Sequence, residues 1–261
     1  MTSQIASDQD RAGAAIRCEA VTRKFAGTGL VLDRISFQVS AGEFVALLGP
    51  SGSGKSSLLR LTAGLDQPDS GSLVIEAASG VLSRGFVFQE ATLMPWRTVL
   101  RNTTLPLELA GWSSADAEPR ALEELRRVRL AEFAARYPHE LSGGMKMRTS
   151  VARALTTRPN LLLLDEPFAA LDEPTRHALQ IQLREIWRAL GMTVVFVTHS
   201  VIEAVFLADR IIVLSQRPAR LLLDQRVALP ETRNAELRTS LEYNNEVRRI
   251  TAVVPVGGEP S

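Results

Sequence analysis

Short apolar runs alternate along the chain with longer stretches in which apolar residues recur at helical spacing. The apolar runs are typical of buried strands and occupy residues 43–48, 161–164, 193–197 and 211–214. Helical patterns follow three of them, at residues 57–63, 174–190 and 201–208. Because strands alternate with helices, the pattern predicts an α/β fold with a mainly parallel sheet.

A second pattern indicates an antiparallel β layer beside this core. Strand-like runs cover residues 16–22, 30–39 and 72–76, and the last follows a turn signal. The middle run alternates in part, with Ile35, Phe37 and Val39 on one face and polar residues between them. Such alternation is typical of a strand with one buried face.

The pattern changes after residues 85–89, which form a further apolar run with the character of a buried strand. Residues 90–155 lack strong strand runs, and residues 114–130 have a helical pattern. This segment is therefore predicted to be a helical insertion within the α/β core.

Three parts are expected along the chain. Residues 1–15 have no clear periodicity and are expected to be loose. Residues 16–222 are expected to form the main domain. Residues 223–261 are expected to be a C-terminal extension with one helix at about 234–249, directly after a strand-like run at 221–227.

Composition restricts the class of protein only broadly. The chain has 261 residues, 45% hydrophobic and 23% charged, with a net charge of +1, so charge gives no indication of a nucleic-acid partner. Cys18 is the single cysteine, which suits a reducing compartment, and its strand-like surroundings favour a small buried apolar residue. No apolar run is long enough to span a membrane and no signal peptide is recognised, so a cytosolic protein is expected.

The strongest chemical signal is a phosphate-binding loop that matches G-x-x-x-x-G-K-[ST]. Its residues are Gly49, Pro50, Ser51, Gly52, Ser53, Gly54, Lys55 and Ser56. The glycines let the backbone approach a ligand, so that N–H groups at a helix N-terminus can cradle phosphates. Lys55 would bridge the β- and γ-phosphates and Ser56 would ligate Mg²⁺. The alternative is a surface turn, against which the order of strand, loop and helix argues.

Two carboxylates follow the apolar run at residues 161–164. In a phosphate-loop protein the first acid at such a strand end, Asp165, holds Mg²⁺ directly or through water. Glu166 would lie near the γ-phosphate, where it could act as general base on the attacking water. The alternative is a pair of solvated acids at a strand end.

A second arrangement for binding anions is Ser142, Gly143 and Gly144, preceded by Leu141 and followed by a helix at residues 145–155. Taken alone, Ser142 would be an ordinary N-cap residue.

The ordered set of motifs resembles the ATP-binding subunits of ABC transporters, over about residues 16–222. The tetrad Leu141–Gly144 matches the signature motif of that family, and residues 168–172 resemble its D-loop. Gln89 matches the Q-loop, and Thr198 and His199 match the H-loop. Phe25 matches the aromatic residue that stacks on adenine, although it could also be a core aromatic.

The resemblance implies an ABC ATPase fold, with a P-loop NTPase core, and an active ATP hydrolase with ATP and Mg²⁺ as cofactors. Glu166, His199 and Gln89 are expected to be catalytic residues, and Gln89 also a metal ligand with Ser56 and Asp165. The phosphate loop, Ser57 and Phe25 are expected to bind ATP. In this family two subunits face head to tail, so Ser142, Gly143 and Gly144 would close over ATP bound by the partner subunit.

One short sequence segment above all resembles the nitrate, sulfonate and taurine importer group. It contains Met94, Pro95, Trp96, Thr98 and Val99. The resemblance implies a dimer, expected to be a homodimer, that works peripherally on the cytoplasmic face of the inner membrane. Its partners would be separate permease subunits and an extracytoplasmic solute-binding protein.

The role of Trp96 is open from the sequence. An exposed Trp96 would be an anchor for a permease helix, whereas a buried Trp96 would be part of the core. Two other classes of protein remain: a soluble ABC-type ATPase acting on nucleic acid or ribosomes, and a small-molecule kinase. A single cassette and near-neutral charge disfavour the first, and Ser142–Gly144 with His199 disfavours the second.

Overall fold

A computed structural model describes residues 13–27 and 29–255 of the chain. The strands are β1 (Ala14–Phe25), β2 (Gly29–Val39), β3 (Phe44–Leu48), β4 (Ser70–Ala77), β5 (Arg84–Val87), β6 (Leu161–Asp165), β7 (Thr193–Thr198), β8 (Arg210–Leu214) and β9 (Leu221–Arg226). The α-helices are α1 (Lys55–Ala63), α2 (Val99–Leu109), α3 (Ser114–Arg127), α4 (Gly143–Leu155), α5 (Glu173–Leu190), α6 (Val201–Leu207) and α7 (Leu241–Thr251). Short 3-10 helices are η2 (Ala131–Phe133), η3 (Pro138–Glu140) and η4 (Glu236–Thr239).

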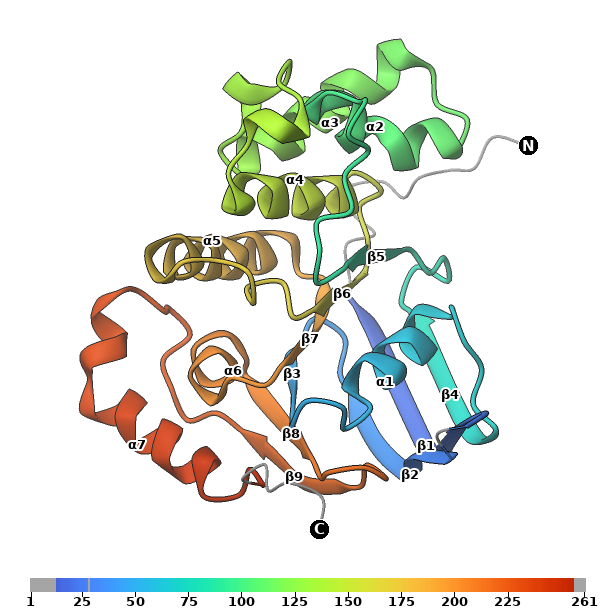
Figure 1. The fold of residues 1–261 in the computed structure, drawn as a ribbon, viewed down its shortest axis with the longest axis vertical. Helices are drawn as coiled ribbons and strands as arrows, with labels where there is room; N and C mark the ends of the chain where they lie inside the picture. Colours follow the sequence, from blue (N-terminus) through green and yellow to red (C-terminus); the bar gives the residue numbers. More distant parts are fainter. Residues whose placement is uncertain (1–12, 28, 256–261) are drawn as a thin grey trace.

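Two sheets build the core (Figure 1), as the sequence predicts. The larger has the order β5-β6-β7-β3-β8-β9, and all its neighbours are parallel except β9, which pairs antiparallel with β8. The smaller sheet, β2-β1-β4, is antiparallel. The inner strands of the larger sheet are apolar except at their ends, because helices or the second sheet cover both of their faces.

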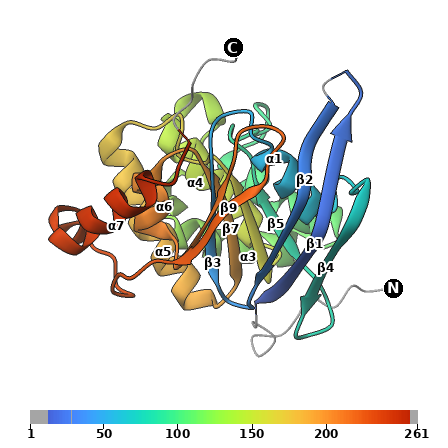
Figure 2. The same cartoon turned by 90° about the horizontal axis from the view of Figure 1, so that it is seen from below.

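Helix α1 lies between the two sheets (Figure 2). Its Leu58 and Leu59 are fully buried in one apolar cluster with Val45 of β3, Ile35 of β2 and Ile16 of β1. The expected alternation in β2 is confirmed, because Ile35 and its apolar neighbours on the same face are buried while the residues between them are exposed. This packing holds the start of α1 at the carboxyl end of β3.

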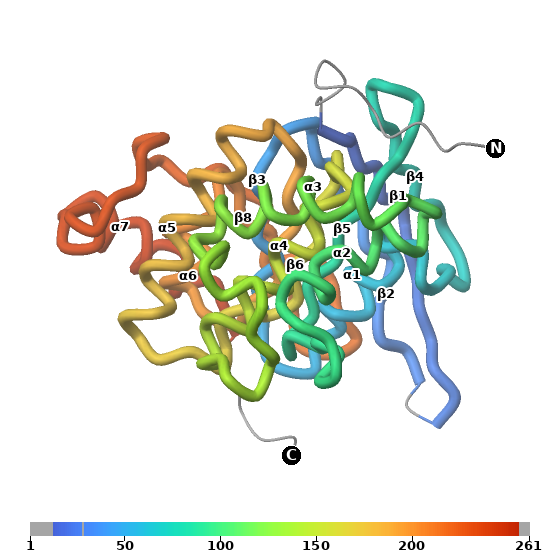
Figure 3. The backbone as a smooth tube through the Cα atoms, turned by 90° about the horizontal axis from the view of Figure 1, so that it is seen from above, coloured from blue at the N-terminus to red at the C-terminus, as the bar shows by residue number. Residues whose placement is uncertain are grey.

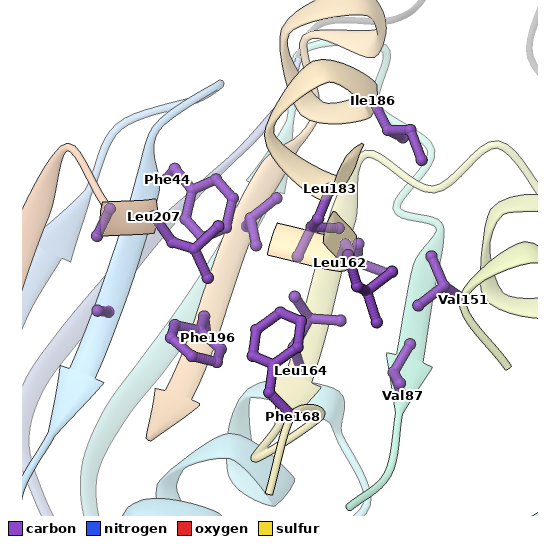
Figure 4. Close-up of a cluster of buried hydrophobic side chains, with 14 of the residues drawn as sticks. Phe44, Val87, Val151, Leu162, Leu164, Phe168, Leu183, Ile186, Phe196 and Leu207 are labelled. Atoms are coloured by element: carbon purple, nitrogen blue, oxygen red, sulfur yellow. The ribbon is translucent and has the colours of Figure 1, made fainter. Parts of the chain in front are cut away.

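The other face of the large sheet carries a second apolar cluster (Figure 4). Phe168 and Phe196 meet edge to face at a centroid distance of 5.6 Å. Leu183 and Ile186 of α5 pack into the same cluster as Leu164 of β6. The loop after β6 is therefore anchored in the core at Phe168, close to the two carboxylates that precede it.

Residues 90–155 contain helices and no strand, as expected for the insertion. In Figure 3, which views the molecule from above, α2 and α3 lie on the near side of the α/β core. Helix α4 connects the helical insertion to the α/β core, because it contacts α2 and α3 of the insertion and β5 and α5 of the core. Strand β5 ends at Val87, so Gln89 lies in the loop after the strand rather than at its end.

Both ends of the main domain differ from the expectation. Ala14 and Ala15 were expected to be loose, but they belong to β1 and pair with β4, while residues 1–12 lie outside the described part. The expected boundary at residue 222 falls inside β9, which completes the large sheet. Strand β1 begins earlier than predicted because pairing with β4 includes Ala14 and Ala15. Strand β9 lies where a strand-like run is predicted, but its pairing with β8 makes it part of the main domain.

The C-terminal extension has a broken helix instead of one continuous helix over 234–249. Ser240 ends η4 and caps α7, where its side chain accepts a hydrogen bond from the backbone N–H of Tyr243. Tyr243 is buried and its O–H donates to the carbonyl of Ile202 in α6 at 2.8 Å. Arg233 is also buried and donates to the carbonyls of Val205 and Phe206. These contacts attach the extension to α6.

Among residues 13–27 and 29–255, no helix is long and apolar enough to cross a membrane.

Candidate nucleotide-binding site

The phosphate loop connects β3 to α1, where the sequence places it. Gly54 caps α1 with φ of 101°, a left-handed conformation that favours glycine. A Cβ atom on Gly54 would lie 2.8 Å from Cγ1 of Val31, so the position has no room for a side chain. Gly54, Lys55 and Ser56 at the N-terminus of α1 line a cavity, and a helix N-terminus is a favourable place for an anion.

Lys55 is the buried cation of the loop, with 4% of its surface exposed. Its Nζ donates to the carbonyls of Gly49 at 2.9 Å and Pro50 at 2.8 Å. Burial lowers the pKa of Lys55, and the nearby carboxylates of Glu166 and Asp165 oppose that change. An ammonium group with this little water around it gains more from an incoming phosphate than an exposed one would.

Ser53 gives an independent sign of a polar ligand. Its hydroxyl is buried, and within the described part of the chain the Oγ atom has no hydrogen-bond partner. A buried hydroxyl without a partner is costly. The phosphate loop therefore contains a hydroxyl group without a hydrogen-bond partner, that of Ser53, close to the N-terminus of α1.

Ser56 and Asp165 meet at the carboxyl edge of the large sheet. The Ser56 hydroxyl donates to Oδ1 of Asp165 at 2.9 Å, although the two residues are 109 positions apart. Burial raises the pKa of Asp165, and the hydrogen bond from Ser56 opposes the rise. A hydroxyl and a carboxylate offer oxygen ligands, the type that a hard divalent cation prefers.

Glu166 and His199 form the second polar pair of the site. Nδ1 of His199 lies 3.0 Å from Oε2 of Glu166. Glu166 has φ of 44°, and its backbone N–H donates to the carbonyl of Val197 at 3.0 Å, so neighbouring strand β7 fixes the turn. The side chain of Glu166 is 17% exposed and that of His199 is 54% exposed.

An open cavity of about 420 Å³ lies over the phosphate loop. Its lining includes nine of the predicted residues, Phe25, Ser51, Gly52, Gly54, Lys55, Ser56, Ser57, Gln89 and Glu166. Phe25 is half-buried at one side, with the guanidinium of Arg23 4.7 Å from its ring centre. Gly49, Pro50 and Asp165 do not line the cavity, but they are held next to it by the contacts described above. Ser53 does not line the cavity either, and its backbone N–H donates to the carbonyl of Pro50 at 3.2 Å.

Sequence reasoning missed Val31 and Arg217 as cavity residues. Val31 comes from β2, and Arg217 comes from the loop between β8 and β9. A usable signal existed for Arg217, because it follows the carboxyl end of β8, and β8 is parallel to β3. Ligands of open α/β sheets bind at that edge.

Ser142, Gly143 and Gly144 are absent from the lining of this cavity. They begin α4, and Ser142 caps the helix by accepting a hydrogen bond from the N–H of Met145. Gly143 is exposed, and a Cβ on Gly144 would lie 2.3 Å from Cγ2 of Thr175. Figure 1 shows α4 well apart from α1. Within one chain, the two anion-binding motifs therefore do not meet.

Comparisons with known proteins identify the family. The family model described as ABC transporter matches residues 32–169. An aliphatic sulfonates import ATP-binding protein, SsuB 1 of Mesorhizobium japonicum, is 47% identical over 86% of this chain and 84% of its own length. A nitrate import ATP-binding protein, NrtD of Synechocystis, is 44% identical over 78% of each chain.

A solved structure has the same fold. It is a dimeric ATP-binding cassette in a post-hydrolysis state bound to ADP and Pi, with a TM-score of 0.72 and 31% identity. The match covers 82% of this chain and all of that chain. The matching family model, the matching architecture and the relatives that share most of the chain together show that this chain belongs to the ABC transporter family, as an ATP-binding subunit with the ABC ATPase fold.

Proposed function

We propose that this protein hydrolyses ATP to power the import of a small anion, such as an organic sulfonate or nitrate, through a separate membrane permease. The observation that carries the proposal is the cavity at the N-terminus of α1, which Lys55, Ser56 and Glu166 line together. The import function and the class of solute rest on the names of relatives that share most of the chain.

The residues of the cavity divide into binding and reacting groups. The backbone of the phosphate loop and Lys55 bind the β- and γ-phosphates. Glu166 orients the attacking water and accepts its proton, while His199 holds the Glu166 carboxylate in place. Mg²⁺ bound with the nucleotide would neutralise phosphate charge, and Ser56, Asp165 and Gln89 are the residues that would hold it.

A dimer completes the site. Ser142, Gly143 and Gly144 lie outside the cavity of their own chain, and Ser142 and Gly143 are exposed at the start of α4. A second copy placed head to tail would bring these residues over the nucleotide and contribute another helix N-terminus to its phosphates. ATP would then stabilise the closed dimer and ADP with phosphate would release it.

Trp96 is the proposed anchor for the permease. Its side chain is 72% exposed, which excludes the alternative of a core residue. The surrounding loop is held by the buried Asn102, whose side chain accepts from the N–H of Met94 and donates to the carbonyls of Met94, Arg97 and Thr98. A large aromatic residue on a fixed loop has the character of a binding hot spot.

The proposed assembly is peripheral, on the cytoplasmic face of the inner membrane. An extracytoplasmic solute-binding protein would deliver the anion to the permease. The permease and the solute-binding protein determine which solute is carried.

ATPase assays with and without the permease test the proposal. Addition of the reconstituted permease should raise the ATPase rate several-fold, whereas DNA or RNA should not change it. Trp96→Ala should remove the stimulation and keep the basal rate. Leu241→Ala is the matched control, because Leu241 is 73% exposed on α7, away from the helical region (Figure 1). Stimulation by nucleic acid alone would contradict the proposal.

A further inference from the structure

We infer that Glu203 is a positioning residue for ATP hydrolysis, whose carboxylate fixes the turn that carries His199 and connects this turn to the loop that follows Glu166. The inference rests on the proposed function and adds a residue to it. Glu203 lies in the first turn of α6, does not line the nucleotide cavity and belongs to none of the motifs described above.

The carboxylate of Glu203 is buried and has polar partners on two sides. Oε2 accepts a hydrogen bond from the hydroxyl of Thr198 at 2.7 Å. Oε1 lies 3.6 Å from Nε of Arg176. Burial raises the pKa of Glu203, and the hydrogen bond from Thr198 and the charge of Arg176 oppose the rise. Because a buried carboxylate without partners is costly, these two contacts restrict where the side chain can lie.

Through Thr198, Glu203 fixes the turn between β7 and α6. Oγ1 of Thr198 also accepts from the backbone N–H of Ser200 at 3.0 Å, and Oγ of Ser200 accepts from the backbone N–H of Glu203 at 3.3 Å. In a capping box the glutamate bonds the N–H of the N-cap residue directly, whereas here the Thr198 hydroxyl lies between them. The closed ring of hydrogen bonds holds the backbone on both sides of His199, whose imidazole contacts Glu166.

Through Arg176, Glu203 contacts the loop that follows Glu166. Nη2 of Arg176 donates to the carbonyl of Leu171 at 2.7 Å. The same loop is anchored in the core by Phe168. One carboxylate therefore joins the supports of both members of the pair formed by Glu166 and its histidine.

The position of Glu203 predicts an effect on hydrolysis rather than on nucleotide binding. None of the contacts of Glu203 described above includes a residue of the phosphate loop. The general base must lie within hydrogen-bond reach of the attacking water, and a displacement of about 1 Å can lower a rate on the order of 100-fold. Loss of Glu203 should therefore lower kcat and leave KM for ATP nearly unchanged.

The test is a set of ATPase assays that measure kcat and KM of the full chain. Glu203→Ala should lower kcat by about 10- to 100-fold and change KM by less than about 3-fold. Glu203→Gln should recover part of kcat, because its amide oxygen can accept from Thr198 but carries no charge for Arg176. Thr198→Val should also lower kcat. It keeps the charges of Glu203 and Arg176, so it tests the link to His199 even where Glu203→Ala is unstable.

Two further measurements separate positioning from a loss of stability. Glu203→Ala/His199→Ala should be slower than His199→Ala by less than about 3-fold, because Glu203 acts mainly through His199. The matched control is Glu246→Ala. Glu246 is also a buried glutamate paired with an arginine, Arg249, but it lies on α7, apart from α1 (Figure 1). Its loss should lower the thermal midpoint and change kcat by less than about 2-fold.

Three results would overturn the inference. The first is an unaltered kcat in Glu203→Ala while Glu166→Gln is inactive, a pattern that leaves the proposed function intact. The second is losses that multiply in the double variant with His199→Ala, which would mean that Glu203 acts independently of His199. The third is an equal fall of kcat in Glu246→Ala, which would mean that lost stability lowers the rate. Failure of the unaltered protein to hydrolyse ATP would instead contradict the proposed function.

Discussion

His199 and Glu166 are 33 positions apart in the sequence, yet Nδ1 of His199 lies 3.0 Å from Oε2 of Glu166. The order of strands explains the contact. Strands β6 and β7 are parallel neighbours, with Asp165 opposite Val197, so the residues just beyond their carboxyl ends lie side by side. Glu166 lines the cavity over the phosphate loop, whereas His199 does not line it and is held beside Glu166.

Replacement of Glu166 by Gln should separate binding from turnover. The amide is nearly the same size and cannot accept a proton from water, so ATP hydrolysis should fall by about 10²- to 10⁴-fold. Nucleotide affinity should remain within a few-fold of the unaltered protein. A phosphate-release assay and an ATP titration measure the two quantities. Hydrolysis at the unaltered rate would contradict the role of Glu166.

The double variant Glu166→Gln/His199→Ala should be no slower than Glu166→Gln alone. His199→Ala by itself should lower the rate strongly, because the Glu166 carboxylate loses its hydrogen-bond partner. Residues that act as a unit give non-additive losses, so the second change should add little to the first. Rates that multiply in the double variant would mean that the two residues act independently.

Lys55→Ala should lower ATP affinity without unfolding the protein. The lost charge-assisted contact is worth about 1.5–3 kcal/mol, which corresponds to roughly 10- to 150-fold in Kd. The thermal midpoint should not fall greatly, because a buried ammonium group with a lowered pKa contributes little net stability. Calorimetric titration and a melting curve test both statements. An unchanged Kd would contradict the assignment of the phosphate loop.

Arg120→Ala should destabilise the helical insertion. Glu124 is fully buried in α3, and Nη1 of Arg120 lies 2.7 Å from its Oε1. Removal of Arg120 leaves a buried carboxylate with a weaker partner, Arg127 at 3.4 Å, and should cost about 3 kcal/mol of unfolding free energy. Urea denaturation measures the change.

The matched control for this change is Arg126→Ala on the same helix. Arg126 is exposed, so its loss should cost no more than about 0.5 kcal/mol. Equal destabilisation by the two substitutions would show that loss of the buried ion pair does not account for the effect of Arg120→Ala.

Cys18 should react with thiol reagents only after unfolding. Burial raises the pKa of its thiol to about 12, and Sγ donates to the carbonyl of Ile35 at 3.4 Å. At pH 8 only on the order of one molecule in ten thousand would carry a thiolate, whereas the unfolded chain has an ordinary cysteine. Labelling in native buffer should therefore be more than 100-fold slower than in urea. Complete labelling within minutes in native buffer would show that the antiparallel sheet opens readily.

The local sequence pattern is sufficient to predict those parts of the candidate site that consist of consecutive residues. The position of the phosphate loop between a strand and a helix, and the apolar strands before the loop and before Asp165, agree with the prediction, because each depends on neighbours in the chain. Ser142 is the N-cap of α4, which the sequence left open as the alternative to an anion-binding role. The helix α2 was not predicted individually. Its buried Asn102, Thr103 and Thr104 interrupt the apolar periodicity, since their polar groups are paired inside the insertion rather than exposed.

By itself the sequence determined where the phosphate loop lies, because the loop needs only a glycine-rich turn between a strand and a helix. Tertiary structure decided what surrounds that loop. Parallel pairing of β6 with β7 joined Glu166 to His199, and attachment of the β8–β9 loop to β2 placed Arg217 in the lining of the same cavity as Phe25. The exposure of Trp96 also depends on what packs around it. Periodicity shows that a residue prefers burial or solvent, but the order of strands determines which distant residues meet.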